Sequence, residues 1–227
     1  MSERSSTRLG VIFDNDGTLL DTERLSASTL IEVVKEWFGI EGFDLEPYRR
    51  KGGKYLTQIA RDLGHERMAN AFKDEIHIRI GRVVERGLEP MSGAVALIEG
   101  LKEKGVVLGV ASQTAFTHTN HRLVSAGLRD YFDAVSGGNQ VRYGKPHQGL
   151  LHRVADQMGV NYFNCTVMGD MDTDIIAAIR AGMGAIKVSP DPFIGDLRYR
   201  PHMQVGGLTH LSAETVIGLA RRRRPRR

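Results

Sequence analysis

Four short apolar runs constrain the fold most, because each is typical of a buried strand and helical patterns surround them. The runs cover residues 9–13, 106–111, 164–168 and 185–188. Apolar residues recur at helical spacing over residues 93–104, 117–126, 148–158 and 173–181. Strands that alternate with helices in this order predict an α/β fold, in which a parallel sheet carries helices on both faces.

Residues 22–90 interrupt this alternation. The pattern predicts a helix over residues 26–38 and further amphipathic helices over residues 55–63, 67–73 and 75–86. This stretch of the sequence contains no strand pattern. We therefore expect an all-helical domain at residues 22–90, inserted after the first strand of a core that is formed by residues 1–21 and 91–220.

The positive net charge of the chain comes from its last seven residues. Six of them are arginines, and without these six charges the net charge changes from +4 to −2. The chain without its last seven residues is nearly neutral, so its charge gives no reason to expect nucleic acid as a partner. We expect residues 221–227 to form a solvated, disordered tail, and an anionic partner or surface is the alternative.

We do not expect a membrane as a partner of this chain. The first eight residues are polar and lead directly into a strand pattern, and no stretch has the length of a membrane span. The single cysteine, Cys165, has no partner for an internal disulfide. We expect a cytoplasmic protein that is a monomer or a weak homodimer.

Two acidic clusters directly follow predicted strands. Asp14 and Asp16 come after the first strand, and Asp170, Asp172 and Asp174 come after the third. Ligands of parallel α/β sheets bind at the carboxyl ends of the strands, so we expect the two clusters to converge. Converging carboxylates repel one another unless a cation lies between them, and Mg²⁺ prefers oxygen ligands. The alternative is structural: a polar turn, and acidic residues that complement a helix N-terminus.

Two further residues are candidates for binding an anionic substrate. Ser112 ends the second predicted strand, where its hydroxyl and backbone N–H suit a phosphoryl oxygen. Lys145 lies between Gly144 and Pro146, and the proline favours an extended backbone that can direct the ammonium. Taken singly, Ser112 could be a helix cap and Lys145 an exposed loop residue. Their order relative to the strands favours phosphate binding.

These residues, in this order, resemble the haloacid dehalogenase-like superfamily. Its first motif, a strand followed by Asp-x-Asp-Gly-Thr, matches residues 14–18, and the sequence continues with Leu-Leu-Asp-Thr-Glu. The later motifs match, in order, Ser112, then Lys145 with Pro146, and finally Asp170 with Asp174. The resemblance covers residues 11–188, and the extended first motif is highly specific.

The resemblance implies a Rossmann-like, doubly wound core with a helical cap domain inserted after the first motif, as in β-phosphoglucomutase and sugar-phosphate phosphatases. It implies that Asp14 is the nucleophile and that Asp16 is the general acid and base. Mg²⁺ would be held by Asp14, Asp170 and the backbone carbonyl of Asp16, with Asp174 orienting this shell.

The same resemblance implies contacts with the substrate. Ser112, Gln113 and Lys145 would bind it in the core. Gln113 stands where the family commonly has Asn, and Met171 stands where Ser is common. Apart from the resemblance, a basic loop in the inserted domain could contact a second anionic group of the substrate, and the alternative is a solvated surface loop. Its residues are Arg49, Arg50, Lys51 and Lys54.

Together these features predict a Mg²⁺-dependent phosphatase, a phosphoric monoester hydrolase. Its substrate would be a small phosphorylated metabolite such as a sugar phosphate, and hydrolysis would pass through an aspartyl-phosphate. A phosphosugar mutase of the β-phosphoglucomutase type is one alternative, because the same motifs serve transfer to water and transfer to sugar. A non-catalytic binding module is the other.

Overall fold

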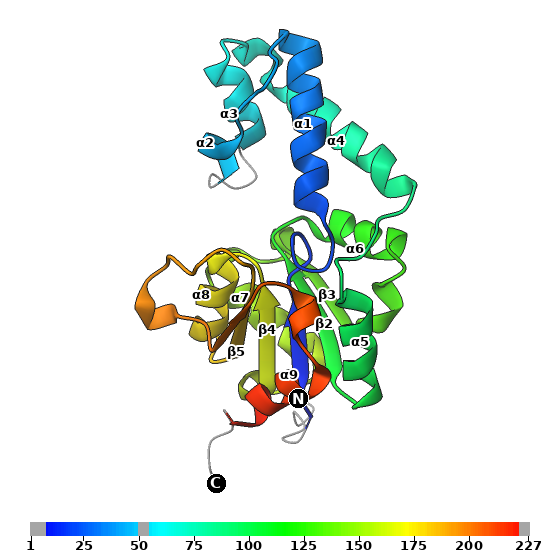
Figure 1. Ribbon diagram of the computed structural model, residues 1–227, viewed down its shortest axis with the longest axis vertical. Helices are drawn as coiled ribbons and strands as arrows, with labels where there is room; N and C mark the ends of the chain where they lie inside the picture. Colours follow the sequence, from blue (N-terminus) through cyan, green and yellow to red (C-terminus); the bar gives the residue numbers. More distant parts are fainter. Residues whose placement is uncertain (1–7, 50–54, 223–227) are drawn as a thin grey trace. The chain divides into compact units, whose positions relative to one another are not determined.

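The computed structural model describes residues 8–49 and 55–222. The chain divides into two compact units. One unit combines the chain before Thr22 with the chain from Leu88 onward, and the other is Thr22–Gly87. The first unit carries a parallel sheet, and every regular element described in the second is a helix (Figure 1).

A six-stranded sheet in the order β3-β2-β1-β4-β5-β6 forms the centre of the larger unit. All paired strands are parallel, and Phe13 in β1 lies opposite Val110 on one side and Met168 on the other. The strands are β1 (Gly10–Phe13), β2 (Val107–Ser112), β3 (Ala134–Gly137), β4 (Cys165–Gly169), β5 (Gly184–Val188) and β6 (Met203–Val205).

The sequence predicted four of these strands and missed β3 and β6. β3 consists of small residues, Ala-Val-Ser-Gly, which do not make an apolar run. β6 has three residues, pairs only with β5 and is partly exposed. Neither strand therefore has the continuous hydrophobic pattern of a central parallel strand.

Helices cover both faces of the sheet, as a doubly wound fold requires. Val11 and Phe13 point into one apolar core with α5, α6 and α9, whereas Ile12 points into a second core with α7 and α8. The predicted α/β fold class is therefore confirmed. The helices are α5 (Ala94–Glu103), α6 (Phe116–Ser125), α7 (Gly149–Met158), α8 (Asp172–Arg180) and α9 (Ala213–Arg222).

The path of the chain through this sheet creates a switch point at β1. From β1 the chain builds β2 and β3 on one side, then returns to build β4, β5 and β6 on the other. The carboxyl ends of β1 and β4 therefore lie at this switch point, which is the place where such folds bind ligands.

The helical unit contains α1 (Thr22–Phe38), α2 (Glu46–Arg49), α3 (Tyr55–Asp62) and α4 (Ala69–Glu85). Phe72 of α4 lies 5.2 Å from Phe38 and 6.0 Å from Trp37, both in α1, measured between ring centroids. The sequence predicted two helices, over residues 67–73 and 75–86, where the structure has the single helix α4. The buried residues of α4 keep one continuous helical period; they are Ala69, Phe72, Ile76, Ile80 and Val84.

Short 3-10 turns connect several elements, at Glu66–Met68, Arg129–Tyr131, Gly138–Gln140, Tyr162–Asn164, Leu197–Tyr199 and Leu208–His210. Across the part of the chain that the structure describes, none of the helices combines the length and the apolar character needed to cross a membrane.

Two expected boundaries differ from the structure. The smaller unit ends at Gly87 rather than at residue 90, because Pro90 pairs with Leu20 of the larger unit. Arg221 and Arg222 belong to α9 and not to a disordered tail, since the buried residues of the helix continue to Ala220 and arginine favours helix. Residues 223–227 lie outside the described chain.

Candidate active site

The loop after β1 is folded tightly against the loop after β4. The backbone N–H of Asp14 donates to the carbonyl of Met168 at 2.8 Å, which continues the pairing of the two strands. Gly17 has a φ of 83°, and a Cβ there would lie 2.7 Å from Asp170 Oδ2. Thr18 Oγ1 donates to Asp170 Oδ1 at 2.9 Å. Glycine and threonine at these positions therefore allow the two loops to meet.

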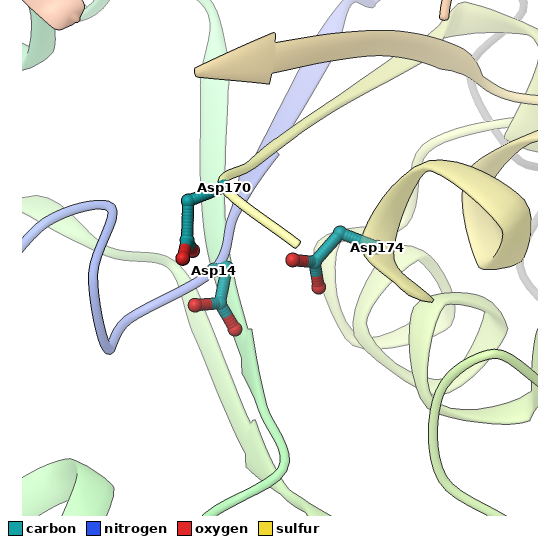
Figure 2. Close-up of side chains that lie close together, drawn as sticks. All are labelled: Asp14, Asp170 and Asp174. Carbon is teal, nitrogen blue, oxygen red and sulfur yellow. The ribbon is translucent and has the colours of Figure 1, made fainter. Parts of the chain in front are cut away.

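Three carboxylates come together where these loops meet. Asp14 follows β1, Asp170 follows β4 and Asp174 lies in the first turn of α8 (Figure 2). One oxygen from each lies within 4.8 Å of the others. The predicted convergence of the two acidic clusters is confirmed for these three residues.

Lys145 supplies a positive charge to this group. Its Nζ lies 2.6 Å from Asp14 Oδ1 and 2.6 Å from Asp174 Oδ1, and its side chain is 1% exposed. Burial opposes the charge of the ammonium, but the attraction of both carboxylates outweighs this effect and raises the pKa of Lys145. Lys145 therefore stays protonated at neutral pH.

Gln113 holds the backbone of Lys145 in place. Its Nε2 donates to the Lys145 carbonyl at 2.8 Å, and its Oε1 accepts from the Lys145 N–H at 3.1 Å. A side chain on Gly144 would collide with the same amide group. The sequence predicted that Gln113 binds substrate, but the structure uses both ends of its amide to fix the lysine.

The total negative charge of the carboxylates is larger than the single positive charge of Lys145. Burial raises the pKa of Asp14 well above its usual value; Lys145 opposes this rise, and the charges of Asp174, Asp170 and Asp16 add to it. Three hard oxygen donors with a surplus of negative charge are a ligand set suited to a divalent cation of the Mg²⁺ type. The residues present therefore fit a metal site.

Asp16 does not join the three carboxylates through its side chain. Its Oδ2 accepts from Ser112 Oγ at 3.0 Å and from Thr114 Oγ1 at 2.9 Å. Its Oδ1 accepts from Asn15 Nδ2 at 3.0 Å and from Arg122 Nη1 at 2.5 Å. The side chains of Asp16 and Ser112 thus meet, and Asp16 has further neighbours that the sequence did not reveal.

A second lysine holds the loop that carries Asp170. Lys187, buried in β5, donates to the backbone carbonyl of Asp170 at 3.0 Å and to Asp172 Oδ1 at 2.7 Å. Asp172 Oδ2 in turn accepts from the N–H of Ile194 at 2.9 Å. A buried lysine needs an anionic partner. The lysine within the apolar pattern of this strand could therefore have indicated, from the sequence alone, that such a contact exists.

Other neighbours of the site were indicated less clearly by the sequence. Thr18 stands inside the first motif. Arg122 lies in α6, three residues after the buried Thr119, so helical spacing alone could have placed it on the inward face. Of the four basic residues expected to read the substrate, Arg50, Lys51 and Lys54 lie outside the described chain, and Arg49 ends α2.

Comparison with known proteins gives the family. The chain matches the family described as haloacid dehalogenase-like hydrolase over residues 11–188. The chain belongs to the haloacid dehalogenase-like hydrolases. This confirms the resemblance drawn from the motifs, and residues 11–188 include every member of the three-carboxylate group.

Among these hydrolases, several relatives have names that state a substrate. Fructose-1-phosphate phosphatase YqaB from Escherichia coli K12 is 30% identical over 79% of this chain and 95% of its own length. A 6-phosphogluconate phosphatase from the same strain is 28% identical over 93% of this chain and 95% of its own length.

A similar solved structure, from Thermotoga maritima, has a title that names a candidate β-phosphoglucomutase. It has a TM-score of 0.75 and 26% identity, and the match covers 94% of this chain and 99% of that one. A β-phosphoglucomutase from Clostridium difficile matches with a TM-score of 0.74 at 19% identity, over 95% of this chain and 98% of that one, which supports the fold alone.

Proposed function

We propose that this hydrolase is a Mg²⁺-dependent phosphatase that hydrolyses a small phosphorylated metabolite, a sugar phosphate or a related phosphomonoester. The proposal is supported most by the place of Asp14. Its carboxylate belongs to the three-carboxylate group and also touches the buried ammonium of Lys145 at 2.6 Å. An anionic nucleophile and an anionic phosphoryl group can approach each other only where positive charge is concentrated.

In the first half-reaction, Asp14 attacks the phosphorus atom. A bond forms between phosphorus and a carboxylate oxygen of Asp14, and the bond from phosphorus to the leaving oxygen breaks. Asp16 gives a proton to that oxygen, so the alcohol leaves in neutral form. Ser112 and Lys145 bind phosphoryl oxygens, and Gln113 contributes by holding Lys145.

In the second half-reaction, water attacks the aspartyl-phosphate. Asp16, now a carboxylate, removes a proton from the water as its oxygen bonds to phosphorus. The bond between phosphorus and Asp14 breaks, and inorganic phosphate leaves with the Asp14 carboxylate restored. The same residue therefore serves as acid and then as base, as microscopic reversibility requires.

Asp14, Asp170 and the backbone carbonyl of Asp16 would hold Mg²⁺, and Asp174 would orient this shell. When bound, the ion offsets the repulsion between the carboxylates and the phosphate. In the other unit, the basic loop with Arg49, Arg50, Lys51 and Lys54 is proposed to bind the part of the substrate that does not react. The names of the two Escherichia coli relatives support a phosphorylated sugar or sugar acid.

A phosphosugar mutase is the second candidate function. The likeness to the Thermotoga maritima structure named as a candidate β-phosphoglucomutase favours it. A mutase would use the same Asp14 and Asp16 but return the phosphoryl group to a second hydroxyl of a sugar. Product analysis separates the two, because only hydrolysis releases inorganic phosphate in step with substrate consumption.

One experiment tests the proposed function directly. Release of inorganic phosphate from fructose 1-phosphate, 6-phosphogluconate, glucose phosphates and p-nitrophenyl phosphate would be measured with and without Mg²⁺, for wild type and Asp14→Asn. We expect Mg²⁺-dependent release from wild type and none above background from the variant. Activity without a divalent cation, or equal activity of the variant, would contradict the proposal.

A further inference from the structure

The carboxylate of Asp16 is held by two chemically different pairs of groups. Oδ1 accepts from the amide of Asn15 at 3.0 Å and from the guanidinium of Arg122 at 2.5 Å. Oδ2 accepts from the hydroxyls of Ser112 at 3.0 Å and Thr114 at 2.9 Å. Asn15 and Arg122 thus contact one oxygen of Asp16, and two hydroxyls contact the other.

Arg122 is the stronger member of the pair on Oδ1. Asn15 is the direct neighbour of Asp16, whereas Arg122 reaches it from α6 and adds a charge-assisted hydrogen bond. The side chains of Arg122 and Asp16 are 16% and 21% exposed, so solvent screens the ion pair less than it would on an open surface. The contact joins helix α6 to the loop after β1.

We propose that Arg122 is a positioning residue that anchors Oδ1 of Asp16 and so fixes the orientation of its carboxylate. This rests on the proposed function, in which Asp16 is the general acid and base. Arg122 touches neither the leaving oxygen nor the phosphoryl group in this account; it acts through Asp16.

The test is a leaving-group series combined with a double-mutant cycle. Values of kcat/KM would be measured for alkyl and aryl phosphates over a wide range of leaving-group pKa, on wild type, Asp16→Asn, Arg122→Met and the double variant. Arg122→Gln is a second, polar substitution, and Arg122→Lys keeps a cation without the guanidinium. Arg129→Met is the matched control, because Arg129 bonds Asn120 and the Phe132 carbonyl instead.

We expect Arg122→Met and Arg122→Gln to lose about 10- to 100-fold on alkyl phosphates and little on p-nitrophenyl phosphate, as a misplaced acid would. Arg122→Lys should recover part of the loss, Arg129→Met should follow wild type, and the double variant should be no slower than Asp16→Asn alone. Equal losses of the Arg122 variants across the series, or losses that multiply in the double variant, would overturn the inference. If Asp16→Asn itself shows no dependence on the leaving group, the proposed role of Asp16 fails instead.

Discussion

Lys145 Nζ lies 2.6 Å from Asp14 Oδ1, and both side chains are buried at the carboxyl edge of the sheet. The lysine comes from the loop before α7 and the aspartate from the end of β1, so the contact exists only in the folded core. Because Asp174 lies equally close to the same ammonium, one cation is shared by two buried carboxylates. This arrangement determines how the site responds to substitution, pH and metal.

Lys145→Met should damage both stability and activity. It leaves Asp14 and Asp174 buried without their shared cation, which we expect to cost about 3–5 kcal/mol of unfolding free energy without metal. Turnover should fall by roughly 10²- to 10³-fold, the usual effect of removing one group that stabilises transition-state charge. Urea unfolding and phosphate release would measure the two losses. Unchanged stability would show that Lys145 does not stabilise the buried carboxylates of Asp14 and Asp174 as described.

Gln113→Ala should reduce activity through Lys145. The substitution removes two hydrogen bonds to the Lys145 backbone, which together stabilise the protein by about 1–3 kcal/mol. We expect kcat to fall by about tenfold on small and large substrates alike, because the lysine serves every phosphoryl group. Gln58→Ala, which removes an exposed hydrogen bond to Asp62 in the other unit, is the control. A change confined to KM for one metabolite would instead make Gln113 a substrate contact.

Asp14→Asn should stabilise the metal-free protein at neutral pH. Burial raises the pKa of Asp14, so the folded state binds this proton more tightly than the unfolded chain does. The stability from this group is complete below its usual pKa near 3.8 and is lost as pH rises through the raised value. At neutral pH the raised pKa of Asp14 thus lowers the stability of the fold, although Lys145 compensates part of this effect.

Thermal unfolding with a chelator would measure this difference. The melting temperature of Asp14→Asn should exceed that of wild type near pH 8, by about 2–4 °C for each kcal/mol of added unfolding free energy. The difference between the two melting temperatures should be smaller near pH 5. Mg²⁺ should raise the melting temperature of wild type more than that of the variant. A variant that is less stable than wild type near pH 8 would contradict the sign of this effect.

The strands that carry the site could be predicted because each is a continuous apolar run that ends at a polar residue. Asp14 and Asp170 follow β1 and β4, and Ser112 is the last residue of β2. Parallel pairing then brings these ends together. β3 and β6 were not predicted, because neither is a continuous apolar run. β3 consists of small residues, and β6 is a short strand at the edge of the sheet. The fold was therefore predictable at its centre and not at its edges.

The partners of the site residues were harder to predict than the site residues themselves. Motif spacing marks Asp16, but its contact with Arg122 spans 106 positions and depends on how α6 packs. The pairing of Gln113 with the Lys145 backbone likewise joins two loops and has no local pattern. The sequence indicates which groups do chemistry, whereas tertiary structure decides what holds them.

The four basic residues between positions 49 and 54 should affect specificity and not chemistry. Alanine at Arg49, Arg50, Lys51 or Lys54 should raise KM for the preferred metabolite, since binding energy from the non-reacting end of a substrate is lost. Turnover of p-nitrophenyl phosphate, which lacks such an end, should change little. Michaelis curves for both substrates on the four variants would decide it. Parallel losses on both substrates would place the loop in the catalytic machinery.

The most direct test of the account is to trap phosphate on Asp14. Asp16→Asn treated with p-nitrophenyl phosphate and Mg²⁺ should form the aspartyl-phosphate, because this leaving group needs little acid help, and should hydrolyse it slowly without a base. Borohydride reduction followed by peptide mass spectrometry would then reveal homoserine at position 14. We predict this product in Asp16→Asn with Mg²⁺ and its absence when Asp14 is also changed to Asn. Release of p-nitrophenol with no modification at position 14, or with phosphate on another residue, would contradict the mechanism.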